Sequence, residues 1–100
     1  MSGDLDYVDL GDLDGTHGWI VTSGFVNWEE DVANHMPRQR VRLGDESTSG
    51  RGVVCTVFND DLVLDEGCGY YLVGEDRTYD PREEVQLSLY ENSTARKFYE

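Results

Sequence analysis

The chain has 100 residues, 38% of them hydrophobic, and carries 21 acidic against 8 basic residues, for a formal net charge of −13. This length supports one domain. Two domains would each be too small to fold without disulfide bonds or bound metals, so a two-domain enzyme is excluded. No apolar run approaches the roughly 20 residues of a membrane-spanning helix, and no secretory signal is recognisable, so we expect a soluble, cytoplasmic protein.

The amino-terminal segment is rich in Asp and Gly, and we expect its first several residues to be frayed. Its apolar residues, which allow part of the segment to dock on a core, are Leu5, Val8, Leu10 and Leu13. From Gly18 onward the chain has the pattern of short β segments between turn signals. The first segment is 18–28, in which the interior Gly24 indicates a bulge or a sharp bend.

The second segment, 40–46, places Val41 and Leu43 on one face of a strand. The opposite face carries Arg38, Arg40 and Arg42. The third segment, 53–58, is apolar on both faces, which predicts a central strand.

The fourth and fifth segments are 69–74 and 84–90. In the fifth, Val85, Leu87 and Leu89 alternate with Glu84, Gln86 and Ser88. This alternation predicts a half-buried strand. The connection between the third and fourth segments has room for one short helical turn. Five strands joined in this way suit a small antiparallel barrel or a compact sandwich.

The charges are distributed unevenly along the chain. Residues 1–36 hold eight acids and no lysine or arginine, whereas residues 37–58 hold four arginines against two acids and form the one net-positive stretch. Three interpretations compete: an acidic partner-binding protein, a nucleic-acid mimic, and a halophilic protein whose self-repulsion is screened by salt. The presence of a single lysine, Lys97, and the spread of acids along the chain favour a halophilic host.

Cysteine and histidine are too few and too scattered for a metal centre. Cys55 and Cys68 form no CxxC pair, and His17 and His35 have no ligand spacing. We therefore expect no metal and no cofactor, and two partly buried free thiols in a reducing cytosol.

In this order the segments resemble the OB-fold, specifically single-stranded-DNA-binding domains of the replication protein A type, from about Leu13 to Thr94. The residues that carry the resemblance are DLDG, then VRLGDEST, VVCTVF, LVLDEGCGYYLVG and TYDPREEVQLSL. The resemblance to haloarchaeal versions of this family agrees with the acidic composition.

The resemblance implies an all-β fold: a five-stranded OB-fold Greek-key barrel with at most one short helical turn between strands 3 and 4. It divides the chain into an acidic, frayed leader (1–12), the OB-fold domain (13–94) and a carboxyl-terminal tail (95–100). It also implies binding of single-stranded DNA, with RNA as the less favoured nucleic acid, in replication, repair or recombination.

Binding of a single strand requires cations along the phosphates and flat side chains on which bases stack. The residues expected to contact phosphates are Arg38, Arg40, Arg42 and Arg51, and those expected to stack on bases are Trp28, Phe58 and Tyr79. The plainer interpretation of the alternating arginines is a solvated strand face. Four other aromatic residues are expected to pack partly in the core or at a barrel end: Trp19, Phe25, Tyr70 and Tyr71.

The sequence departs from the family where an aromatic residue commonly stands in the middle of the third strand, because Val54, Cys55 and Thr56 occupy this region. This departure supports an alternative function: an OB-fold protein-interaction module, or a small subunit of a replication protein A-like complex that contacts a basic partner or another OB-fold subunit. Enzymatic functions are not expected, because no histidine lies in a catalytic motif and no phosphate-binding loop is present.

Overall fold

The computed structural model describes residues 5–30, 39–48, 52–59, 61–79 and 84–100. Their elements are η1 (Leu10–Asp12), β1 (Gly18–Glu30), β2 (Gln39–Gly44), β3 (Val53–Val57), β4 (Gly69–Tyr79), β5 (Glu84–Leu89) and β6 (Thr94–Tyr99). No helix in these ranges is long and apolar enough to cross a membrane.

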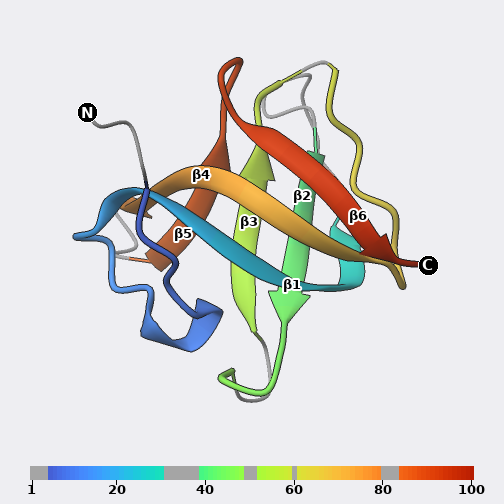
Figure 1. Cartoon of the computed structure of the whole chain (residues 1–100), viewed down its shortest axis with the longest axis horizontal. Coiled ribbons are helices and arrows are strands. Elements are labelled where there is room, and N and C mark those ends of the chain that lie inside the picture. Colours follow the sequence, from blue (N-terminus) through green and yellow to red (C-terminus); the bar gives the residue numbers. More distant parts are fainter. Residues whose placement is uncertain (1–4, 31–38, 49–51, 60, 80–83) are drawn as a thin grey trace.

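The first five strands form a closed barrel in the order β1-β2-β3-β5-β4, which a second pairing between β4 and β1 completes. Neighbouring strands are antiparallel except for β3 and β5, which run parallel. In Figure 1, β1 and β4 cross over β2 and β3. The predicted all-β, five-stranded Greek-key barrel is confirmed, and the described residues between β3 and β4 contain no helix.

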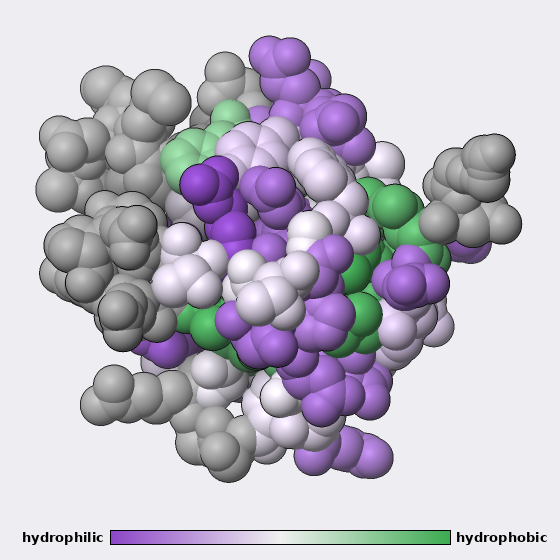
Figure 2. Space-filling model, turned by 90° about the vertical axis from the view of Figure 1, so that its left-hand side faces the viewer, coloured by the Kyte–Doolittle hydropathy of each residue, from purple (hydrophilic) through white to green (hydrophobic). Residues whose placement is uncertain are grey.

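Alternating side chains fill the barrel. On β2, Val41 and Leu43 are fully buried while Arg40 and Arg42 lie on the outer face, as the alternation predicts. Among the coloured residues on the side of the molecule shown in Figure 2, hydrophilic and intermediate residues predominate and hydrophobic residues appear only in small areas, because the large aliphatic side chains are in the core.

The third strand lies between β2 and β5, which confirms its predicted central position. Its Cys55 is fully buried, and Cys68 is also buried; both are free thiols, as predicted. Burial raises the pKa of the Cys55 thiol, so this side chain stays protonated and unreactive in the folded protein.

Segments outside the strands close the barrel ends. Leu64, in the connection between β3 and β4, is buried, and its backbone N–H and C=O both bond the side-chain amide of Gln39. Leu10 of the leader and Leu13 at the start of the predicted domain are both buried, so this segment docks on the core. Gly24 makes the docking possible, since a Cβ there would lie 2.4 Å from Cδ1 of Leu10.

Several strand predictions need correction. The irregularity of β1 lies between Val26 and Trp28, not at Gly24. β4 continues to Tyr79, because its second half pairs with β5 while its first half pairs with β1 and β6. The fifth strand is buried on both faces, since Gln86 and Ser88 are only 5% and 3% exposed.

A sixth strand, β6, pairs with β4 outside the barrel (Figure 1). The sequence does not reveal it, because its side chains are mostly exposed and show no apolar alternation. β6 also affects the aromatic residues. Tyr70 is buried as expected, but Phe25 and Tyr71 are 39% and 50% exposed, so for these two residues the core prediction is wrong. Both rings contact Phe98 of β6 instead.

Candidate nucleic-acid interface

The strand registers order the outward side chains of the barrel into two rows, because directly opposed residues in neighbouring strands share a face of the sheet. The first row contains Trp28, Arg42, Val54, Gln86 and Arg77. The second row contains Arg40, Thr56, Ser88, Glu75 and Trp19. Both rows cross β2, β3 and β5.

The residues in the middle of the rows are buried, whereas Trp28 and Arg77 are exposed and Trp19, Arg40 and Arg42 are half-buried. The buried ones are Val54, Thr56, Gln86 and Ser88. The hydroxyl of Thr56 donates a hydrogen bond of 2.8 Å to Oε1 of Gln86. Trp28 is 40% exposed, and the side chain of Arg77 is 57% exposed. A ligand on this face would therefore meet arginine and aromatic side chains before it met the strands.

An aromatic cluster adjoins the rows. Phe58, directly after β3, stacks on Tyr90 with ring centroids 5.4 Å apart and planes 6° from parallel. On its other side, Tyr90 contacts Trp19 at 6.0 Å. Its hydroxyl accepts a hydrogen bond of 2.9 Å from Nη1 of Arg77. Phe58 remains 38% exposed, so one part of the stack is open to a further flat group.

The rows also concentrate positive charge. Five basic side chains lie in the described parts of the chain, and three of them belong to the rows: Arg40, Arg42 and Arg77. Two glutamates also belong to these rows: Glu75 lies 3.6 Å from Arg77, and Glu30 is directly opposite Arg40 in the register of β1 and β2, with its side chain outside the described part. Nε of Arg40 is buried and has no hydrogen-bond partner. A buried donor without an acceptor costs about 1–3 kcal/mol, and because Nε is covered by the protein, a phosphate oxygen cannot reach it unless the side chain moves.

Four of the residues that the sequence suggested for binding lie on this surface: Trp28, Arg40, Arg42 and Phe58. Arg38 and Arg51 lie outside the described residues. Tyr79 is the last residue of β4, opposite Glu84, and its side chain is outside the described part. The contacts of all seven with nucleic acid stay predictions.

Sequence reasoning missed Trp19, Arg77 and Tyr90 as members of this surface. The sequence does contain a signal for Tyr90. It lies two residues after Ser88, and side chains two residues apart in a strand point to the same face, so Tyr90 continues the outward face of Gln86 and Ser88. For Trp19 and Arg77 no local signal existed, since their place depends on the pairing of β4 with β1 and β5.

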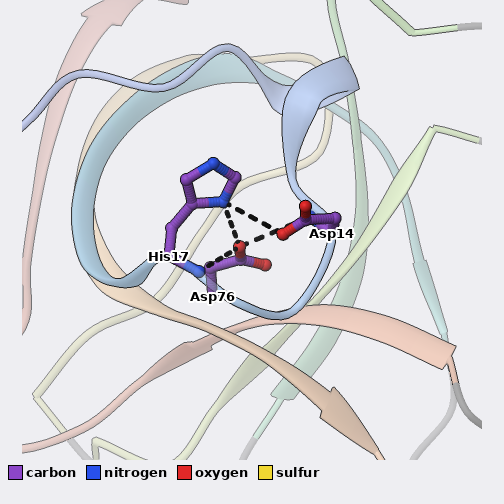
Figure 3. A group of neighbouring side chains, drawn as sticks. All are labelled: Asp14, His17 and Asp76. Atoms are coloured by element: carbon purple, nitrogen blue, oxygen red, sulfur yellow. Dashed lines mark hydrogen bonds and ion pairs between the residues drawn. The ribbon is translucent and has the colours of Figure 1, made fainter.

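A separate polar cluster joins Asp14, His17 and Asp76 (Figure 3). The side chain of Asp76 is fully buried, and Nδ1 of His17 lies 2.6 Å from its Oδ2 and 3.3 Å from Oδ1 of Asp14. The hydrogen bond to Asp76 is the main reason that the pKa of His17 is raised. Three backbone N–H groups, of Asp14, Gly15 and His17, also donate to Asp76, at 3.3, 2.9 and 3.2 Å.

These three side chains have the composition of a cation site, but the contacts of Asp76 indicate another role. Its two oxygens already accept from three backbone N–H groups and face Nδ1 of His17, so a metal ion would displace existing hydrogen bonds. The arrangement is a latch that holds residues 14–17 against β4.

A comparison with solved structures identifies the fold. The solution NMR structure of the OB domain of a protein from Methanosarcina mazei superposes with a TM-score of 0.74, covering 97% of this chain and 87% of that domain at 22% identity. This chain has an OB fold. No family model matches the sequence, and no curated protein matches it.

In OB folds the face of strands 2 and 3 and the loops beside it bind oligonucleotides or oligosaccharides. In this chain the two rows and the Phe58–Tyr90 stack lie on and beside that face. The similarity concerns the fold, so the replication protein A type and the haloarchaeal resemblance stay predictions.

Proposed function

We propose that this OB domain binds single-stranded nucleic acid, DNA above all, across the outer face of β2, β3 and β5. The observation that carries the proposal is the combination of the Phe58–Tyr90 stack, in which Phe58 is exposed, with three arginines on the neighbouring rows, Arg40, Arg42 and Arg77. The proposed role is accessory in replication, repair or recombination and involves no bond-breaking chemistry.

Stacking must supply most of the binding free energy. The chain carries a net charge of −13, which repels phosphates over the whole molecule at low salt. Counterion release also contributes less as salt rises. Stacking of a base on an aromatic ring is worth about 1–3 kcal/mol and does not depend on net charge. The arginines of the rows would then orient the backbone, and a concentrated-salt cytoplasm would screen the repulsion.

The test is a titration of intrinsic fluorescence with oligo-dT, since both tryptophans, Trp19 and Trp28, lie in the rows. We expect saturable quenching in dilute salt and at about 2 M salt, where the Debye length falls to about 3 Å or less. Absence of quenching at both salt concentrations would refute the proposal.

Two variants separate the contributions. Phe58→Ala should weaken binding about 5- to 150-fold at both salt concentrations, the equivalent of one lost stacked base. Arg40→Ala should weaken it in dilute salt and much less at high salt. The matched control is Phe98→Ala, which removes an aromatic ring of similar exposure, 43%, from a different surface and should bind like the wild type. Equal affinities of Phe58→Ala and Phe98→Ala would contradict the assignment of this face.

A further inference from the structure

A second exposed aromatic surface lies on β1, β4 and β6, apart from the Phe58–Tyr90 stack. We call it the aromatic patch, and its members are Phe25, Tyr71, Phe98 and Tyr99, which are 39%, 50%, 43% and 57% exposed. Their rings touch, with centroids 5.6 Å apart for Phe25 and Phe98, 5.6 Å for Phe25 and Tyr99, and 4.8 Å for Tyr71 and Phe98. Clustered apolar exposure of this kind marks an interaction site.

Two backbone features accompany the aromatic patch: Gly69, which leaves room for the rings, and the outer edge of β6. Gly69 lies beneath the rings, since a Cβ there would be 2.8 Å from Phe98 and 3.0 Å from Phe25. Within the described residues β6 pairs with β4 alone, so its other edge presents backbone donors and acceptors. An edge of this kind can accept an additional strand from an extended peptide.

Next to the patch lies an acidic hollow. Phe25, Asp45 and Glu46 line two adjoining hollows of about 500 and 330 Å³, and Asp9 lines the smaller one. Of the lysines and arginines in the described parts of the chain, none lines either hollow. The carboxylates of Asp9 and Glu46 are exposed and form none of the ion pairs found between described residues.

The carboxylate of Asp45 forms hydrogen bonds within its own turn. Its Oδ1 accepts the backbone N–H of Ser47 at 2.7 Å and also the Ser47 hydroxyl. Phe25 belongs both to the aromatic patch and to the hollows, so the two features form one continuous surface. We call it the acidic–aromatic surface.

We propose that the acidic–aromatic surface binds a basic, extended peptide segment of a protein partner. An arginine or lysine of the peptide would enter the hollow beside Asp9 and Glu46, where it could also lie against the ring of Phe25. An apolar residue two positions along would cover the rings of Phe98 and Tyr99. This second site does not depend on the proposed nucleic-acid binding.

Charge decides between the possible occupants. A second copy of the chain would bring another net charge of −13 and is repelled. Phosphates of a nucleic acid would meet three carboxylates lining the hollows, without an arginine or lysine there. A cationic residue of a peptide is attracted by the carboxylates of the hollows. Arg96 lies opposite Tyr71 beside the aromatic patch, so the basic residue belongs in the hollow and the apolar residue over the rings.

The test is a fluorescence anisotropy titration of the whole chain with a labelled peptide of about ten residues in which arginine and leucine alternate, a length that spans one added strand. We expect saturable binding that weakens as salt rises. A peptide with glutamate in place of arginine should not bind, and one with serine in place of leucine should bind at least fivefold more weakly. Equal binding of the arginine–serine peptide would overturn the role of the aromatic patch.

Variants locate the site. Glu46→Gln and Phe98→Ala should each weaken binding of the arginine–leucine peptide at least fivefold. Their matched controls are Glu91→Gln, another exposed carboxylate, and Val63→Ala, another exposed apolar side chain, and both should leave binding unchanged. If Glu46→Gln, which alters no packing, binds like the wild type, the acidic half of the proposal is wrong.

Two further measurements exclude the other occupants. Labelled oligo-dT, titrated in the absence of peptide, should bind Phe98→Ala as it binds the wild type, and weaker binding to Phe98→Ala would show that a nucleic acid takes this surface. Sedimentation should show a monomer both for the wild type and for Phe98→Ala, and a dimer lost in Phe98→Ala would show that the surface joins two copies of the chain. Either result would overturn the proposal while leaving the test of Phe58 and Arg40 intact.

Discussion

Replacing Asp76 by alanine removes the latch that holds residues 14–17 against the barrel. The carboxylate is fully buried and accepts backbone hydrogen bonds from Asp14, Gly15 and His17. Asp76→Ala leaves these three donors without their acceptor and opens a small cavity beside β4. We therefore expect a stability loss with no change to the outer face of β2, β3 and β5.

The size of the loss follows from the three backbone bonds. A hydrogen bond contributes about 1 kcal/mol net, and more when the acceptor is charged, but two of these bonds are long, at 3.2 and 3.3 Å. The contact with the exposed ring of His17 depends on pH and is not counted in this sum. Asp76→Ala should therefore lower the free energy of unfolding by about 3 kcal/mol.

Urea unfolding followed by tryptophan fluorescence measures this loss as a shift of the midpoint at constant slope. The control is Asp12→Ala, an exposed aspartate of the same segment, which should change stability by less than about 0.5 kcal/mol. A loss below about 1 kcal/mol in Asp76→Ala would refute the reasoning. It would mean that water accepts the hydrogen bonds of the three backbone N–H groups as well as the carboxylate does.

Asp76→Asn tests the same latch at nearly constant volume. The carboxamide can turn so that its oxygen replaces Oδ2 and accepts from Asp14 and His17, which places its NH2 group against the N–H of Gly15. We expect it to recover no more than about two thirds of the loss seen in alanine, since at most two of the three backbone bonds remain. Full recovery would show that shape and not hydrogen bonding stabilises the loop.

The remaining predictions concern pH and the leader. The pKa of His17 is raised from 6.5, mainly by its hydrogen bond with Asp76, so its stabilisation is complete below about pH 6.5 and is lost as pH rises through the higher folded-state pKa. The wild type should therefore melt at a higher temperature than His17→Gln at about pH 6, and this difference should become smaller by about pH 8.5. A difference that stays constant with pH would show that the His17–Asp76 hydrogen bond does not stabilise the fold. Leu10→Ala should destabilise the protein by about 2–5 kcal/mol in urea unfolding, because the side chain is fully buried. A loss below about 1 kcal/mol would show that the leader is not part of the core.

Local patterns were sufficient where the strand period alone places a side chain. Val41 and Leu43 face the core while Arg40 and Arg42 face outward, because the side-chain period of a strand is two residues and needs no partner. The apolar run of β3 likewise revealed a central strand. These strands were enough to predict an all-β barrel.

Local patterns failed where a neighbour supplies the burial or the contact. Gln86 and Ser88 look like an exposed strand face in the sequence, yet both are buried, and Gln86 bonds to Thr56, 30 residues away. β6 shows no alternation at all and exists because it pairs with β4. Phe25 and Tyr71 were expected partly in the core or at a barrel end, but their rings are exposed and pack against Phe98 of β6 instead.

The sequence by itself determined which residues alternate between core and surface, because that alternation depends on backbone geometry within one strand. The tertiary structure decided which outward residues meet. The parallel pairing of β3 with β5 stacks Phe58 on Tyr90, and the closing pair of β4 and β1 brings Trp19 beside them. Such contacts between residues far apart in the chain depend on sheet registers that no local pattern specifies, and the whole barrel selects those registers when it buries its core.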